Sequence, residues 1–416
     1  MASRPESKCG EKVDAKDQLV TELKKLEKDI SKELHNVMSF WLTNSHDREN
    51  GGFYNCLGED GSVYDKYKYV WMLGRQIWTY CRLYNETEKY HKKEIVDVAK
   101  QGAEFLRRNG KRSDNRCYFC LTADGKPVKL QRTIFSECFY VMAMSELAKA
   151  TNDASYKAEA VAVMKSIINW YESGELPDGH LPLEGATPVN ALSGPMMMLG
   201  ITNQICYCFP EFNDEFRDFK TRAVKMILQH LQQDGEVVLE NVSVNGSEIE
   251  GSAGRLMNPG HALEAGWFLL EYAEETRDEQ LKNVAIEKFI KLPFETGWDK
   301  VHGGLFYFLD ADGLSPVQLE WNMKLWWPVC EAMIAFLMAF KYTHDKQFLE
   351  TFKKALEYAF QHFRDVVHGE WYGYLDQRGS VTHNFKGGPF KGCFHVPRTL
   401  HMCGKMLAEI IQKLQS

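Results

Sequence analysis

The chain reads GGLFYFLDADG from Gly303 to Gly313, an apolar and aromatic run enclosed by a glycine pair and an Asp–Gly pair. Such a run is typical of a short β-hairpin. The pattern returns clearly in GGFYNCLGEDG at 51–61 and in GEWYGYLDQRG at 369–379. Weaker copies lie at 117–125, 179–184 and 234–240. Six copies at separations of several tens of residues indicate a repeat architecture.

Between the copies, apolar residues at helical spacing predict pairs of helices joined by short turns. We expect twelve helices, at 17–42, 68–84, 94–108, 133–150, 154–172, 191–209, 213–231, 260–275, 278–292, 326–342, 345–363 and from near Val396 onward. Short links alternate with long hairpin-bearing loops, so the two kinds of connection should lie at opposite ends. We therefore predict an all-α fold, an (α/α)6 barrel with an inner and an outer ring of helices and with short β-hairpins in the long loops at the active-site end. A linear helical solenoid is the alternative, because periodicity alone does not prove closure.

Length alone would suggest two or three domains, but closed barrels of repeated units exceed the usual domain length. We therefore expect a single catalytic domain over 15–416, preceded by a disordered tail at 1–14. The chain has 416 residues, 44% hydrophobic and 26% charged, with a net charge of −7. The negative charge argues against nucleic acid and against an anionic membrane surface. We see no apolar signal-peptide core in the polar N-terminus and no run of roughly 18 apolar residues. Eleven cysteines without framework spacing favour a reducing compartment, hence the cytoplasm.

In such a barrel the even-numbered helices all begin at the long-loop end, so their first turns should converge on one cleft. The stretch KGCFHVPR at 391–398 brings an imidazole, a thiol and a guanidinium to the start of the last helix. Other inner-helix starts carry Arg75, His261 with Glu264, and Glu331, while Asn190 precedes the sixth helix. Tryptophans at these starts, such as Trp327, would suit the C–H faces of a sugar.

A structural role has to be weighed beside this one. A single buried histidine is more often a hydrogen-bonded structural residue than a catalyst. Two histidines, two glutamates and two arginines at one end of six helices favour a shared functional cleft, because burying them without partners is costly.

Metal and thiol chemistry find less support. The chain has no His-Glu-x-x-His, and its histidines are not clustered at ligand spacing, so we expect no metal. Cys393 lies beside His395 and could act as a nucleophile. The favoured role for Cys393 is a site-proximal thiol whose modification would crowd the cleft.

Three stretches, GHALEAGW at 260–267, WWPVCEAM at 326–333 and CFHVPR at 393–398, resemble the N-acylglucosamine 2-epimerase family, whose animal members are also called renin-binding proteins. The resemblance covers essentially the whole chain beyond the tail. It implies a homodimeric (α/α)6 barrel that interconverts N-acetylglucosamine and N-acetylmannosamine in amino-sugar and sialic acid metabolism. It also implies ATP as a non-consumed activator, binding of renin, and no metal or redox cofactor.

Mapped by motif, the family's acid/base pair falls on His261 and His395. Its other essential residues fall on Arg75, Glu331 and Arg398. We expect substrate contacts from Glu264, Asn190, Trp327, Tyr67 and Phe390. Related disaccharide epimerases carry a further histidine on the sixth helix, where this chain has Pro195 and Met196, which argues against cellobiose as substrate.

Epimerisation beside a carbonyl needs a proton removed from one face of C2 and returned to the other. Two histidines suit this work, because each can act as base or acid near neutral pH. Two alternatives stay open: an (α/α)6-barrel glycoside hydrolase using Glu264 and Glu331 as paired carboxylates, and a non-catalytic renin-binding regulator.

Overall fold

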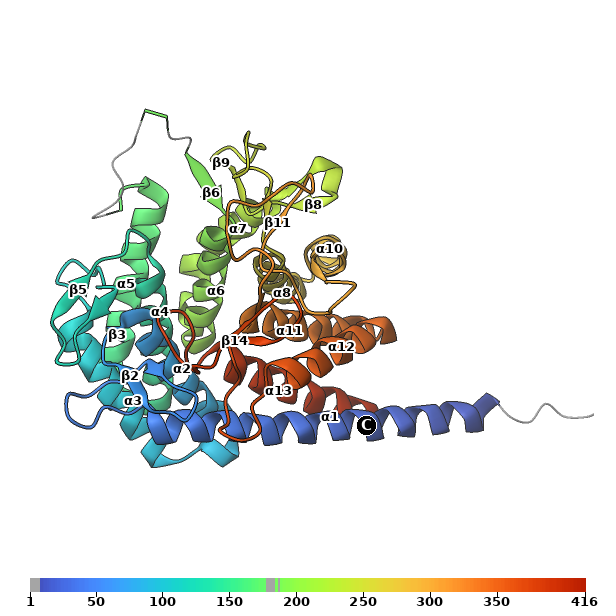
Figure 1. The fold of residues 1–416 in the computed structure, drawn as a ribbon, viewed down its shortest axis with the longest axis horizontal. Helices are drawn as coiled ribbons and strands as arrows, with labels where there is room; N and C mark the ends of the chain where they lie inside the picture. The colour runs from blue at the N-terminus through green and yellow to red at the C-terminus, as the bar shows by residue number, and fades with distance from the viewer. Residues whose placement is uncertain (1–7, 177–183, 186–187) are drawn as a thin grey trace, which may run out of the picture.

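The computed structural model describes residues 8–176, 184–185 and 188–416 (Figure 1). Six helices form an inner ring in which each packs against the next: α2 (Val70–Glu86), α4 (Phe135–Thr151), α6 (Ser193–Cys208), α8 (Pro259–Thr276), α11 (Trp326–Thr343) and α13 (His395–Gln415). The last of them, α13, contacts α2 again, so the ring is closed. This closure confirms the predicted barrel and excludes the linear solenoid.

The outer ring is made of α1 (Lys8–Asn44), α3 (Lys93–Phe105), α5 (Ala154–Ser173), α7 (Asn213–Leu228), the broken helix α9–α10 and α12 (Lys346–His362). In Figure 1 the long helix α1 runs beside the C-terminal helix α13, and the two are in contact. α1 starts at Lys8, so residues 8–14, expected in a disordered tail, are helical, while residues 1–7 lie outside the described part. The predicted ninth helix is split into α9 (Glu279–Val284), a π-helical segment Ala285–Lys291 and α10 (Leu292–Gly297).

Burial explains the two rings. Every residue of α11 from Trp326 to Phe340 is buried, and Glu331 is the one charged residue among them. A helix that is apolar on all sides can only lie inside a protein. Its outer partner α12 buries one stripe, with Phe352 and Leu356 on it, and exposes the rest. Because the inner helices are otherwise apolar, the few charged residues in their sequences, such as Glu331, are the polar groups that lie in the middle of the barrel.

The hairpin prediction holds for four copies and fails for a fifth. Antiparallel pairs form between β1 and β2 (Cys56–Leu57, Val63–Asp65), β4 and β5 (Cys120–Leu121, Pro127–Lys129), β7 and β8 (Leu231–Gln232, Val237–Val238), and β13 and β14 (Tyr374–Leu375, Val381–His383). The prediction of a self-paired hairpin at 303–313 is wrong, because β11 (Leu309–Asp310) pairs instead with β10 (Leu256–Met257) just before α8. Residues 179–183 of the third copy lie outside the described residues.

Three copies share a buried ion pair that ties a loop to the next inner helix. Asp47, Asp299 and Asp365 each accept a hydrogen bond from a lysine near the start of a later element, at 2.7 Å from Lys68, 3.0 Å from Lys324 and 2.9 Å from Lys386. These side chains are almost fully buried. Each lysine also donates to a backbone carbonyl of the same turn. The repeated pair thus holds the loops that carry the cleft.

Glu370 occupies a position where the first and fifth copies have glycine. Its φ is +51°, close to the +74° of Gly52 and the +75° of Gly304. A left-handed backbone costs a non-glycine residue roughly 1 kcal/mol. The fully buried carboxylate of Glu370 offsets this cost by accepting hydrogen bonds from Trp41 of α1 and, at 2.9 Å, from Lys391 just before α13. These contacts join α1, the first helix of the outer ring, to the loop that leads into α13, the last helix of the inner ring.

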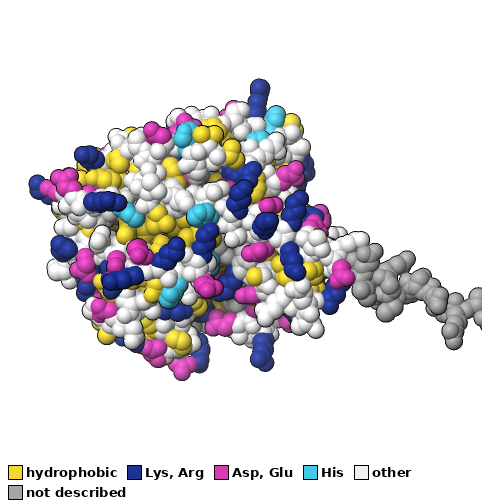
Figure 2. Space-filling model, turned by 90° about the horizontal axis from the view of Figure 1, so that it is seen from below, with side chains coloured by type: hydrophobic (Ala, Val, Ile, Leu, Met, Phe, Trp, Pro, Cys, Tyr) yellow, Lys and Arg dark blue, Asp and Glu magenta, His cyan; other side chains and the backbone are white. Residues whose placement is uncertain are grey.

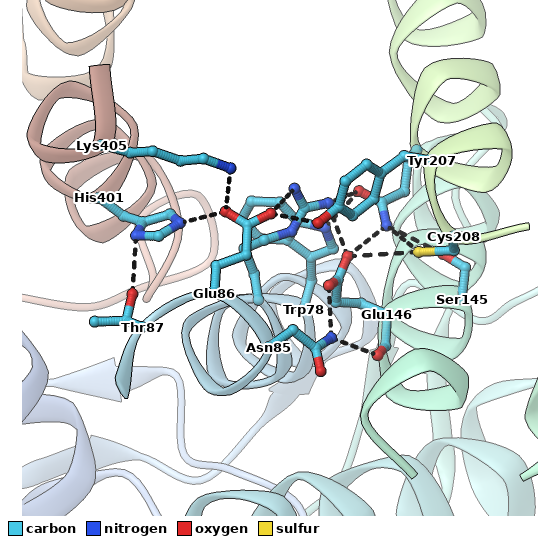
Figure 3. A network of polar contacts seen from close by, with 12 residues as sticks. Trp78, Asn85, Glu86, Thr87, Ser145, Glu146, Tyr207, Cys208, His401 and Lys405 are labelled. Atoms are coloured by element: carbon cyan, nitrogen blue, oxygen red, sulfur yellow. Dashed lines mark hydrogen bonds and ion pairs between the residues drawn. The ribbon is translucent and has the colours of Figure 1, made fainter. Parts of the chain in front are cut away.

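At the short-link end, four inner helices are joined by a polar network (Figure 3). Arg82 of α2 donates to Glu146 of α4 at 2.7 Å and to Glu86 at 3.2 Å, and Glu86 in turn pairs with His401 of α13 at 2.9 Å. Gln204 of α6 donates to Glu146 at 2.7 Å. These groups satisfy one another, which explains why so many charges lie at this end of the barrel.

The outer surface carries mixed charge. On the face drawn in Figure 2, Lys, Arg, Asp and Glu side chains are interspersed. Within the described residues, no helix is both long and apolar enough to cross a membrane. The ten cysteines from Cys56 to Cys403 are all unpaired.

The buried ion pairs predict a stability cost. Lys68→Met leaves the carboxylate of Asp47 buried without its cation, which should lower the free energy of unfolding by about 3 kcal/mol. Lys126→Met is the matched control, since Lys126 pairs with Asp124 on the surface, where a pair contributes about 0.5 kcal/mol. Urea titrations of both variants check this, and equal losses in the two would contradict a structural role for the buried pair.

Candidate active site

One cavity of about 1050 Å³ occupies the middle of the barrel. It reaches from the hairpin-bearing loops to the polar network of the short-link end, and side chains of all six inner helices line it. Seven of the residues predicted from the sequence are among them: Arg75, His261, Glu264, Trp327, Phe390, His395 and Arg398. The inner-helix starts therefore do converge on one hollow.

The two imidazoles both lie beside one tryptophan. The ring of Trp327 is 5.1 Å from that of His261 and 6.0 Å from that of His395, measured between centroids. His261 is the third residue of α8, and His395 is the first residue of α13. Asn258 caps α8 by accepting from the backbone N–H of His261 at 3.1 Å, which fixes this histidine in the first turn.

His261 is paired with a carboxylate that the sequence reading missed. Its Nδ1 lies 3.0 Å from each carboxylate oxygen of Glu240, which follows β8 in the loop before α8. Burial alone would lower the pKa of His261, but the charge and the hydrogen bond of Glu240 outweigh burial, and the pKa is raised above its usual 6.5. Glu240 occupies Nδ1, so Nε2 is the nitrogen of His261 that is left to exchange a proton with a ligand in the cavity.

His395 also has a carboxylate at Nδ1, yet its pKa moves the other way. Nδ1 lies 2.8 Å from Glu331 Oε1. Burial is the largest cause that lowers the pKa of His395 well below 6.5, and the positive charges of Arg398 and Arg75 add to it. Nδ1–H donates to Glu331, so the neutral ring presents an unprotonated Nε2.

Arg398 compensates the two buried glutamates. Its Nη2 donates to Glu264 Oε1 at 3.0 Å and to Glu331 Oε1 at 2.5 Å, and all three side chains are more than nine-tenths buried. Trp267 Nε1 donates to the other oxygen of Glu331 at 3.0 Å. The ligand atoms of Glu264, Glu331 and His395 lie within 4.8 Å of one another. The cation that this triad holds is thus the guanidinium of Arg398.

The same contacts bear on the hydrolase alternative. A glycoside hydrolase needs two carboxyl groups that are free to flank the scissile bond. Glu331 is fully buried, and both of its oxygens accept hydrogen bonds from other side chains. Glu264 is held by the same nitrogen of Arg398. The geometry therefore gives this pair a structural and electrostatic role.

Arg75 is a cation with no carboxylate bound to it. Its guanidinium lies between aromatic rings, 4.2 Å from the centroid of Phe139 and 5.1 Å from that of Trp71. Its one hydrogen bond among the described residues is a 4.0 Å contact with Met72 Sδ, and its Nε is buried and unpaired. Burial lowers the pKa of Arg75 to about 9, so the group is charged at neutral pH. An unpaired cation that lines a cavity is suited to an oxyanion.

Three other predicted residues lie elsewhere. Tyr67 is 43% exposed and does not line the cavity. Asn190 lies in β6 (Val189–Ala191) opposite Val242 of β9 (Asn241–Ser243), also outside the lining. The thiol of Cys393 is fully buried, and burial raises its pKa well above 9, so it is neither exposed for modification nor ready as a nucleophile.

The signal for Glu240 was present in the sequence but weak. Glu240 ends the fourth copy of the hairpin pattern, two residues after the buried strand β8. A carboxylate that is buried at such a position needs a partner for its charge. No local spacing links it to His261, because the pairing depends on how the loop folds over α8.

The cavity and its residues can now be compared with known proteins. A family model described as N-acylglucosamine 2-epimerase (GlcNAc 2-epimerase) matches residues 52–396. The N-acylglucosamine 2-epimerase of Mus musculus is 52% identical over 390 residues, 93% of this chain and 93% of the mouse protein. That of Homo sapiens is 49% identical over 386 residues, 92% of this chain and 90% of the human protein.

Among solved structures, the cellobiose 2-epimerase from Bacillus thermoamylovorans superposes with a TM-score of 0.79 at 18% identity, covering 93% of this chain and 100% of that chain. At this identity the likeness supports the barrel fold alone. The family model covers most of the chain, and the mouse relative is aligned with 93% of it. This chain therefore belongs to the N-acylglucosamine 2-epimerase family and is an epimerase.

Proposed function

We propose that this protein interconverts N-acetyl-D-glucosamine and N-acetyl-D-mannosamine by inverting C2 of the ring-opened sugar. One observation carries the proposal: two imidazoles line one cavity, both beside Trp327, and their surroundings shift their pKa values in opposite directions. A neutral imidazole and a protonated one are the base and the acid that an epimerisation beside a carbonyl requires. The family membership supplies the choice of sugar.

The proposed steps follow from the protonation states. Nε2 of neutral His395 removes the proton from C2, and the electron pair moves into the adjacent C1–O group to give an enolate whose negative charge lies on the C1 oxygen. The charge of Arg75 stabilises that oxygen. Nε2–H of protonated His261 then returns a proton to the opposite face of C2, and the carbonyl reforms. In the reverse direction the histidines exchange roles. Glu240 and Glu331 are positioning residues, because each fixes the tautomer of one imidazole.

The finer properties implied by the family resemblance belong to the same proposal. They are activation by ATP that is not consumed, a homodimeric state, binding of renin, a cytoplasmic location and a place in amino-sugar and sialic acid metabolism. Family membership alone supports them, and each stays a prediction. Measuring the epimerisation rate with and without ATP, and the mass of the protein in solution, tests the first two.

Proton NMR in D2O with purified protein and N-acetylmannosamine gives the first test. We expect N-acetylglucosamine to appear with deuterium at C2, since the proton comes from a group that exchanges with water. His261→Asn and His395→Asn should each abolish turnover while the far-UV circular dichroism stays unchanged. His344→Asn is the control, because His344 lies at the end of α11 in a left-handed conformation that Asn tolerates.

Retention of the original C2 hydrogen would replace the two-base scheme with direct transfer. Absence of any epimerisation, or release of reducing sugar from a glycoside, would reject the proposed function in favour of a regulator or a hydrolase.

The opposite pKa shifts predict a bell-shaped pH profile of kcat/KM. Activity should fall below an apparent pKa lower than 6.5, where His395 becomes protonated, and above one higher than 6.5, where His261 loses its proton. Glu240→Gln removes the charge that raises the pKa of His261, so the alkaline limb should move to lower pH and the acid limb should stay. Glu236→Gln in the same loop is the control, since Glu236 pairs with Lys288 at the surface. An alkaline limb that does not move in Glu240→Gln would contradict this assignment.

The role of Arg75 predicts a loss in kcat. Arg75→Met removes a charge aimed at the developing oxyanion, which should lower kcat by roughly 10²- to 10³-fold, with a smaller change in KM. Arg217→Met is the control, because Arg217 lies on the surface beside Asp214. Steady-state kinetics of both variants check this. A rise in KM with kcat intact would assign Arg75 to ground-state binding.

A further inference from the structure

One side of the cavity has an apolar wall that the proposed mechanism does not use. Five side chains from α4, α6 and α8 form it: Phe139, Met142, Met196, Met197 and Phe268. Four of them are at least nine-tenths buried, and Met197 is partly buried. We call this wall the apolar lobe. Its sulfur and ring atoms cannot bind sugar hydroxyls well, so a different part of the substrate must suit it.

The apolar lobe adjoins the group that would hold the reacting oxygen. The guanidinium of Arg75 lies 4.2 Å from the ring centroid of Phe139, and Phe139 in turn lies 5.4 Å from Phe394, the residue before His395. Met142 follows Phe139 by one turn of α4. A sugar whose C1 oxygen faces Arg75 carries its C2 substituent one bond away. In that orientation the C2 substituent is among the groups of the sugar nearest to Phe139.

The lobe also has depth. Gly200 of α6 lets the ring of Phe268 lie against the helix, because a Cβ at Gly200 would be 2.9 Å from Phe268 Cζ. Three of the five side chains are methionines, which adapt their shape to what they contact. The whole cavity, about 1050 Å³, exceeds what one hexose needs. The cavity therefore has room beside one hexose for a chain longer than one methyl group.

We propose that the apolar lobe binds the acyl arm on the C2 nitrogen, with Met196 and Met142 setting the acyl chain length that the enzyme accepts. This inference rests on the proposed function, since it assumes that C2 lies between the two histidines. It gives a role to the three methionines and two phenylalanines that line this part of a sugar site. It assigns to α4 and α6 the choice of N-acyl substituent, and to α2, α8, α11 and α13 the chemistry.

The test compares kcat/KM for N-acetyl-, N-propanoyl- and N-butanoylmannosamine. Met196→Ala removes three heavy atoms from the lobe, and the ratio of N-butanoyl to N-acetyl activity should rise by about fourfold per added CH2 group, the factor that burial of one CH2 gives. Met142→Ala should act in the same direction and serves if Met196→Ala fails to fold. Met198→Ala is the matched control, because Met198 is fully buried on the same helix but does not line the cavity.

A second readout does not depend on turnover. The reduced, open-chain N-acyl glucosaminitols cannot epimerise, and their affinities by calorimetry should follow the same chain-length order in each variant. Unchanged ratios in the folded Met196→Ala and Met142→Ala proteins, or an equal change in Met198→Ala, would overturn the inference. If unmodified protein fails to epimerise N-acetylmannosamine, the proposed function fails. The affinities for the N-acyl glucosaminitols then still decide whether the apolar lobe binds acyl chains.

Discussion

The guanidinium of Arg398 is the interaction on which the centre of this barrel depends. It reaches from α13 to Glu264 on α8 and to Glu331 on α11, so one cation joins three consecutive inner helices. All three groups are buried, and removing Arg398 would leave two carboxylates without their cation in a low-dielectric interior. The carboxylates raise the pKa of Arg398 despite its burial, so it stays charged.

The same contact explains how two histidines with similar partners come to differ. Each has a carboxylate at Nδ1, but Glu240 serves His261 without a bound cation, whereas Glu331 is shared between His395 and Arg398. The negative charge near His395 is therefore already neutralised, and burial together with two arginines favours the neutral ring. A functional asymmetry thus arises from the distribution of one positive charge and not from the imidazoles themselves.

Much of the fold and of the candidate site could be predicted from the sequence, because helical spacing, glycine turns and charged residues at inner-helix starts are local signals. Arg75, His261 and His395 were found in this way, and the resemblance placed the same residues in the site. What could not be predicted depends on contacts between distant segments. The pairing of β11 with β10, the partner of His261 in Glu240 and the burial of the Cys393 thiol all follow from how loops fold over the ring. Tyr67 belongs to a strand-to-strand turn whose outward direction no periodicity encodes.

Trp327 lies beside both imidazoles, and the proposed mechanism has a consequence for the two rings between turnovers. After one inversion His395 carries a proton and His261 has lost one. Under that mechanism the free enzyme therefore exists in two protonation states, each ready for one direction of the reaction. Proton exchange with water in the cavity must restore the first state before the same direction can run again.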